Sequence, residues 1–186
     1  MRETALLPGQ ACLTVPVPRL EDWVRERTAH YDDSFVSTDP TFAHAHLTLL
    51  APWLAEPVAA DLDRVADVLA AVPAFEVALT RVTAFPDGLV HAVPEPDAPL
   101  RALTAALAAA FPACPPYGGR YDSTGGPVPH VTLDRVGAGT TVDSVRRSVG
   151  DLLPAVLRVD RVDLQWWGNH ACRRLHTWWL PSGRVL

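Results

Sequence analysis

Two short stretches of the chain share one pattern of polar and apolar positions. Residues 45–49 read Ala-His-Leu-Thr-Leu, and residues 129–133 read Pro-His-Val-Thr-Leu. Side chains alternate between the two faces of a β-strand, so each histidine and its threonine point one way and the branched apolar residues point the other way. The pattern predicts two strands, each with one polar face and one buried face.

The remaining apolar periodicity predicts further strands and helices. Apolar spacings of three and four residues are typical of amphipathic helices, and strict alternation is typical of strands. We expect helices over residues 19–30, 58–72, 100–111 and 142–153, and strands over 11–17, 75–82, 89–93, 156–166 and 175–180. A Gly-, Pro- and Tyr-rich loop is expected over 114–127. Most of the 18 prolines fall between these elements, where proline ends a helix or a strand.

The predicted elements occur twice in the same order. Residues from about 11 to 82 and from about 89 to 166 each give a strand, a helix, a His-x-Thr strand, a helix, Pro-Ala and a strand, and a closing strand covers about 174–181. Such a repeat predicts one bilobal domain over residues 1–186, with two similar lobes related by a pseudo-twofold axis. The two His-x-Thr strands would then face each other across a groove.

Composition narrows the class of protein. Hydrophobic residues make up 48% of the chain and charged residues 20%, which is ordinary for a soluble globular protein. The net charge of −5 argues against binding to long duplex nucleic acid, which needs a basic surface. All 16 basic residues are arginine, so a nucleophilic lysine is excluded. The three cysteines form no disulfide or zinc pattern, and no apolar run is long enough to span a membrane. We therefore expect a cytoplasmic monomer without a membrane anchor.

Two imidazoles and two hydroxyls on facing strands suit acid–base chemistry on a phosphate. A metal site is the alternative, because His44 and His46 share a strand face, but no acidic or cysteine partner lies at ligand spacing. His44 is instead expected beside the site or facing solvent. Tyr117, Tyr121, Trp166 and Trp167 could stack on a base or pack in the core. Arg120, in the loop over 114–127, is a further candidate for substrate binding because of its positive charge.

The paired motif resembles that of the two-histidine phosphoesterase superfamily, in its branch of 2′-5′ RNA ligase-like proteins and 2′,3′-cyclic nucleotide phosphodiesterases. The likeness covers roughly residues 11–181 and rests on the stretches 46–53, 85–88, 129–135 and 178–181. It implies an α+β fold in which two mainly antiparallel sheets face a central cleft, with helices outside. It also implies that His46 and His130 form the acid–base pair, that Thr48, Thr132 and Arg135 bind the phosphate, and that no metal or other cofactor is required.

The expected activity is hydrolysis of a 2′,3′-cyclic phosphate, or a related cyclic phosphodiester, on a nucleotide or an RNA end. Two alternatives use the same cleft. One is ATP-independent 2′-5′ RNA ligation, which agrees with the missing lysine, and the other is a non-catalytic protein that binds a nucleotide or a phosphorylated metabolite. The sequence does not separate them, and it does not say which histidine is the acid and which the base.

Overall fold

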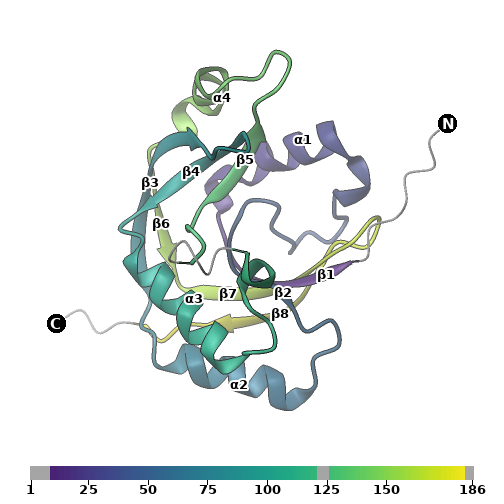
Figure 1. The fold of residues 1–186 in the computed structure, drawn as a ribbon, viewed down its shortest axis with the longest axis vertical. Helices are drawn as coiled ribbons and strands as arrows, with labels where there is room; N and C mark the ends of the chain where they lie inside the picture. Colours follow the sequence, from purple (N-terminus) through teal and green to yellow (C-terminus); the bar gives the residue numbers. More distant parts are fainter. Residues whose placement is uncertain (1–8, 121–125, 183–186) are drawn as a thin grey trace.

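The strands form one antiparallel sheet in the computed structural model, which describes residues 9–120 and 126–182. The sheet has eight strands in the order β6-β3-β4-β5-β2-β1-β7-β8, and it is curled (Figure 1). In chain order, the strands are β1 (Gln10–Pro16), β2 (His46–Trp53), β3 (Phe75–Ala84), β4 (Leu89–Glu95), β5 (Val131–Arg135), β6 (Ala155–Val159), β7 (Arg161–Trp167) and β8 (Arg173–Trp179).

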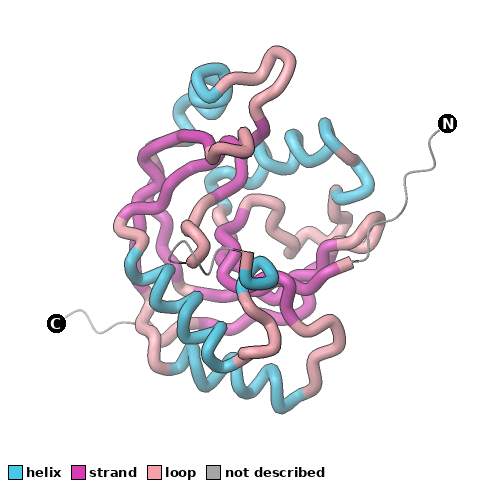
Figure 2. The backbone as a smooth tube through the Cα atoms, in the orientation of Figure 1, coloured by secondary structure: helices cyan, strands magenta, loops and turns pink. Residues whose placement is uncertain are grey.

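The four expected helices are confirmed (Figure 2). They are α1 (Glu21–Tyr31), α2 (Ala59–Ala70), α3 (Ala98–Ala110) and α4 (Val142–Val149), and short 3-10 turns cover Pro18–Leu20, Asp33–Phe35, Pro116–Gly119 and Gly150–Leu152. Helix α3 consists almost entirely of alanine and leucine, which have high helix propensity. No helix in the described ranges is long and apolar enough to cross a membrane.

The two halves of the sheet meet between β2 and β5. The register between these strands is a single antiparallel pair, Leu47 with Val131. This pair joins β6-β3-β4-β5 to β2-β1-β7-β8. The expected antiparallel strands are therefore confirmed, but the two separate sheets are not: the described strands form one continuous curled sheet.

The predicted strand over 156–166 is in fact two strands. The strand breaks at Asp160. Before the break, β6 pairs with β3 at one edge of the sheet; after it, β7 lies between β1 and β8. The alternation changes phase at the break: apolar residues fall at 157 and 159 before it and at 162, 164 and 166 after it, and the polar residues Asp160 and Arg161 lie between them. Each half of the sheet consequently contains strands from both predicted repeat units, and the repeat itself stays a prediction.

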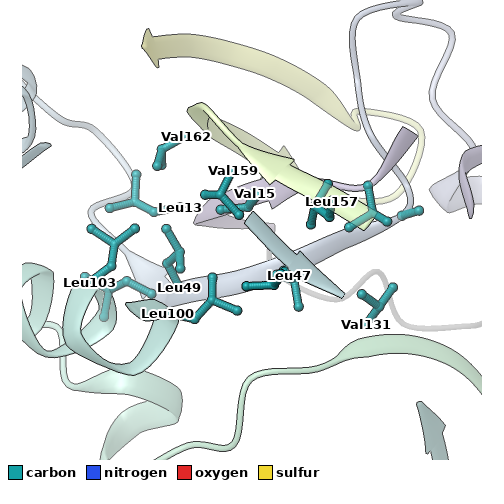
Figure 3. Packing of buried hydrophobic residues seen from close by; sticks show 14 of the residues in the cluster. Leu13, Val15, Leu47, Leu49, Leu100, Leu103, Val131, Leu157, Val159 and Val162 are labelled. Atoms are coloured by element: carbon teal, nitrogen blue, oxygen red, sulfur yellow. The ribbon is translucent and has the colours of Figure 1, made fainter. Parts of the chain in front are cut away.

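The hydrophobic core lies on the face of β2 and β5 opposite the motif side chains. Figure 3 shows Leu47 and Leu49 of β2 beside Leu100 and Leu103 of α3. All four side chains are buried, and burial of one leucine stabilises the fold by about 1.5–3 kcal/mol. With this face fixed in the core, the alternation of the strand turns His46 and Thr48 to the other side.

Helix α1 differs from the expectation that all helices lie outside the sheet. It packs against β5 and contributes side chains to the wall of a cleft. The helices α2 and α3 lie side by side on the core side (Figure 1), and α4 packs against β3.

Candidate active site

The two His-x-Thr motifs meet where the halves of the sheet join. Extending the antiparallel register from Leu47 and Val131 sets His46 across from Thr132 and Thr48 across from His130. Opposed residues of an antiparallel pair share a face, so the four polar side chains belong to one side of the sheet. This arrangement follows the alternation that the sequence predicts.

A cleft of about 660 Å³ opens on this side of the sheet. Seven of the candidate site residues selected from the sequence line it, and His44 lines it as well; the seven are His46, Thr48, Tyr117, Arg120, Thr132, Arg135 and Trp167. His130 is not among its lining residues, although its side chain is only partly buried. The structure therefore brings His46, both motif threonines and Arg135 to one cleft, whereas His130 lies on the same side of the sheet outside the cleft lining.

Both motif histidines are held in the same way. In each ring, Nδ1 lies 2.8 Å from the carbonyl oxygen of the residue two positions earlier, His44 for His46 and Val128 for His130. A carbonyl oxygen only accepts a hydrogen bond, so Nδ1 carries the proton and donates it. In the neutral rings, Nε2 is left as the proton acceptor.

His46 is packed against the indole ring of Trp167, with the ring centroids 5.2 Å apart. Burial lowers the pKa of His46 to about 4, and the charge of a protonated His130 acts in the same direction. His46 is therefore neutral near pH 7.

His130 is flanked by two aromatic rings that sequence reasoning did not select. Its ring lies edge-on to Phe85 at 5.0 Å and to His91 at 5.5 Å, and Phe85 stacks on His91 at 3.8 Å. Burial lowers the pKa of His130, and the charge of His91 lowers it further, whereas that of Asp87 raises it. The sequence offered one sign of this role, because His91 lies in the predicted strand that follows Pro-Asp-Gly at residues 86–88. In the sheet, His91 pairs with Thr132.

The remaining selected residues have mixed outcomes. Arg135 lines the cleft and donates a hydrogen bond to the carbonyl oxygen of Asp87 at 2.8 Å. Tyr121 lies outside the described residues. Trp166 does not line the cleft but packs against the hydrophobic core, and its neighbour Trp167 lines the cleft instead. The reason is alternation along β7: Trp166 pairs with buried Ala11, and Trp167 pairs with Gln10 at the cleft.

Helix α1 supplies a polar cluster that the sequence analysis missed. Arg27 makes a bidentate ion pair with Asp134, through Nε to Oδ2 at 2.9 Å and Nη2 to Oδ1 at 3.1 Å, and the Tyr31 hydroxyl also donates to Oδ1. All three residues line the cleft. The available signal was the spacing of four residues between Arg27 and Tyr31, although the predicted helix ends at residue 30, one residue before Tyr31.

His44 does not have the geometry of a metal ligand. Its Nε2 accepts a hydrogen bond from the Ser37 backbone N–H at 3.1 Å, and its Nδ1 lies 2.6 Å from a carboxylate oxygen of Glu21. Both ring nitrogens are therefore used, and the residue is buried. Of the two expected positions for His44, the one facing solvent is wrong, and the one beside the site agrees with its place in the cleft lining. Within residues 9–120 and 126–182, no group of three or more His, Cys, Asp or Glu side chains could hold a metal ion.

Fold and site together define a phosphoesterase-like protein with two His-x-Thr motifs. The family model described as the 2′-5′ RNA ligase superfamily matches residues 16–171. The chain belongs to this superfamily. No curated protein sequence matches the chain significantly.

Several crystal structures share the fold. LigT of Escherichia coli complexed with 3′-AMP is 19% identical, with a TM-score of 0.53 over 94% of this chain and 99% of LigT. A structure described as a phosphoesterase is 17% identical, with a TM-score of 0.54 over 95% of this chain and 100% of that one. TT0787 of Thermus thermophilus is 18% identical, with a TM-score of 0.52 over 94% of this chain and 100% of that one. At these identities, the likeness establishes the fold.

Proposed function

We propose that the protein is a metal-independent phosphoesterase that hydrolyses a 2′,3′-cyclic phosphate, or a related cyclic phosphodiester, on a nucleotide or an RNA end. The observation that carries this proposal is the pairing of Leu47 with Val131, which sets two His-x-Thr motifs on one side of the sheet. The matched hydrogen bonds from Nδ1 in His46 and His130 add support, because each ring then has Nε2 for proton transfer.

The chemistry assigns a role to each motif residue. One histidine removes a proton from the attacking water, and the other donates a proton to the departing ribose oxygen. The Thr48 and Thr132 hydroxyls donate hydrogen bonds to the non-bridging phosphate oxygens, on which negative charge grows in the transition state. Arg135, at the far end of β5, lines the same cleft and adds a fixed positive charge that can bind the phosphate.

The cleft suits a substrate of nucleotide size. Its volume of about 660 Å³ lies within the range of small-molecule sites, and Trp167 offers an aromatic face close to His46. LigT has been crystallised with 3′-AMP, ATP and NADP+, which supports a nucleotide as the ligand class of this fold. A net charge of −5 favours a small nucleotide or a single RNA end over a duplex. We expect the monomer to be sufficient for activity.

The test is turnover of the four nucleoside 2′,3′-cyclic phosphates, with the products separated by chromatography. We expect hydrolysis that persists in excess EDTA and is abolished in His46→Ala and in His130→Ala. His176→Ala serves as the matched control, because His176 is exposed on β8. Loss of all activity in EDTA, or full turnover by both motif variants, would show that the two-histidine mechanism is wrong.

Two other functions remain as outcomes of the same assay. ATP-independent 2′-5′ ligation would use the same histidines, with the 5′-hydroxyl of a second RNA in place of water as the group that attacks the cyclic phosphate, and the family description favours testing it. It would appear as joined product when an RNA with a 2′,3′-cyclic end is mixed with a 5′-hydroxyl RNA. Binding of nucleotides without any product would instead indicate a non-catalytic binding protein.

A further inference from the structure

One peptide group connects a carboxylate to His46. The Ala45 backbone N–H donates to Glu21 Oε2 at 2.9 Å, and the His44 carbonyl oxygen accepts from His46 Nδ1 at 2.8 Å. These N–H and C=O groups belong to the same planar peptide unit, the one between His44 and Ala45. The carboxylate and the imidazole therefore bind opposite ends of one polarisable unit.

Glu21 is held firmly in this position. It is the first residue of α1, where the helix dipole favours a negative charge, and its Oε1 also accepts from the His44 backbone N–H at 3.1 Å. The His44 ring donates through Nδ1 to the same oxygen, because its Nε2 is occupied by the Ser37 N–H. Burial acts to raise the pKa of Glu21, but the hydrogen bonds from His44 and Ala45 outweigh it and keep the pKa below the ordinary value.

His130 lacks such a connection. Its Nδ1 donates to the carbonyl oxygen of Val128, and that carbonyl belongs to the peptide unit between Val128 and Pro129. Proline has no backbone N–H, so no carboxylate can bind the other end of this unit. The two motifs thus differ in this connection because of Ala45 against Pro129, although their histidines are held alike.

We propose that Glu21 is a positioning residue of the active site, which acts on His46 through the His44–Ala45 peptide unit. This inference rests on the proposed phosphoesterase function. Hydrogen bonds in a chain polarise one another, so the carboxylate strengthens the His44 carbonyl as an acceptor of the Nδ1 proton. That effect favours the imidazolium that forms when His46 takes up a proton, as the carboxylate of a catalytic triad does for its histidine.

The relay assigns the direction of proton transfer. Neutral His46 takes a proton from water at Nε2 while the water oxygen forms a bond to phosphorus. The bond from phosphorus to one ribose oxygen breaks, and His130, which enters this step as the imidazolium, gives that oxygen the proton from its Nε2. The product is a phosphomonoester with a free hydroxyl, and solvent exchange returns both histidines to their starting states. Glu21 stabilises the positive charge on His46 during this step.

Several charges face His46 and bear on its titration. Glu21 on α1 acts to raise the pKa of His46, whereas His130 beside β5 and His44 on its own segment act to lower it. Trp167 on β7 supplies an uncharged ring. Removing the Glu21 charge therefore leaves only the charges that lower the pKa.

The test compares Glu21→Gln with Glu26→Gln, because Glu26 is exposed on the same helix. The pKa of each histidine is measured by NMR titration of the ring Cε1–H. We expect Glu21→Gln to lower the pKa of His46 by roughly half a unit or more and to leave that of His130 in place. An unchanged His46 pKa in a folded Glu21→Gln variant overturns the proposal.

Kinetics on a nucleoside 2′,3′-cyclic phosphate give the second measurement. We expect Glu21→Gln to lower kcat roughly tenfold and to leave KM unchanged. This is a part of the about 100- to 10,000-fold rate increase that a positioned acid or base supplies. The acid limb of the kcat profile should move to lower pH, which a purely structural defect would not produce. If the wild-type protein shows no turnover, the proposed function is wrong. The NMR titration still tests whether Glu21 acts on His46, because it does not depend on turnover.

A third measurement needs no variant and covers the case in which Glu21→Gln does not fold. In the wild-type protein, the amide proton of Ala45 should shift as His46 is protonated, because both bind the same peptide unit. An Ala45 amide that does not respond to the titration of His46 overturns the proposal.

Discussion

Leu47 of β2 is the register partner of Val131 of β5, and this pair joins the two halves of the sheet. Both side chains are fully buried, so the joint is anchored in the hydrophobic core. Each of these residues lies between a motif histidine and a motif threonine. The placement of the two motifs relative to each other therefore follows from the pairing of β2 with β5 at this position.

The threonines of the two motifs provide the first prediction. Thr48→Val and Thr132→Val remove a hydroxyl but keep the β-branched shape that suits a strand. We expect each change to lower kcat/KM on a 2′,3′-cyclic nucleotide by roughly 100-fold, which is the cost of losing one preorganised donor to a developing oxyanion. Steady-state kinetics measure the effect, and the exposed loop residue Thr38, changed to Val, is the control. Unchanged kcat/KM in both motif variants would contradict the assignment.

Trp167 provides a prediction about substrate binding. Its ring lines the cleft next to His46, and stacking of a base on an aromatic ring contributes about 1–3 kcal/mol. Trp167→Leu should therefore raise KM roughly 5- to 100-fold with little change in kcat. Trp179→Leu is the matched control, since Trp179 is 65% exposed on β8 and outside the cleft. Equal KM values for the two variants would show that Trp167 does not bind the base.

The sequence was sufficient for most of the local structure, because local patterns determine it. Alternation across residues 45–49 gave the cleft face of His46 and Thr48 and the core face of Leu47, and periodicity gave all four helices. The two His-x-Thr motifs could also be recognised from the sequence, because the same residue pattern occurs twice between matching predicted elements.

What could not be predicted depends on contacts between distant residues. The break at Asp160 sends β6 and β7 to opposite halves of the sheet. The change of phase in the apolar positions marks the break, but the partners of the two strands are set by contacts that the local sequence does not state. The choice between Trp166 and Trp167 depends on the pairing of β7 with β1, which the sequence does not state. Glu21 and His44 are 23 residues apart and meet only after α1 docks, and His91 reaches His130 only through the pairing of β4 with β5.

His91 is expected to tune His130. The positive charge of His91 acts to lower the pKa of His130, so its removal should raise that pKa. His91→Phe keeps an aromatic ring against Phe85 and removes the titrating group. If His130 is the acid, the alkaline limb of the kcat/KM profile should move to higher pH together with the pKa of His130 measured by NMR. His176→Phe is the control on exposed β8, and a fall in the His130 pKa of His91→Phe would contradict the expectation.

The depressed pKa of His46 predicts a loss of stability on acidification. Its pKa is about 4 in the folded protein and near 6.5 in the unfolded chain, so the unfolded chain binds more protons between these values. The free energy of unfolding therefore falls as pH decreases through this window. From pH 7 to pH 5, where the ordinary carboxylates are still ionised, the contribution of His46 is about 1–2 kcal/mol, reduced by the water that reaches the cleft.

Urea unfolding at pH 7 and pH 5 measures this effect, with His46→Gln compared to the wild-type protein. We expect the wild-type protein to lose more stability than the variant over this interval, because glutamine takes up no proton. His91 and His130 also have lowered pKa values and are present in both proteins, so their effects cancel in the comparison. Equal losses of stability in the two proteins would mean that the pKa of His46 is not lowered. His46 would then already be protonated near pH 6, and it could not accept a proton from water there.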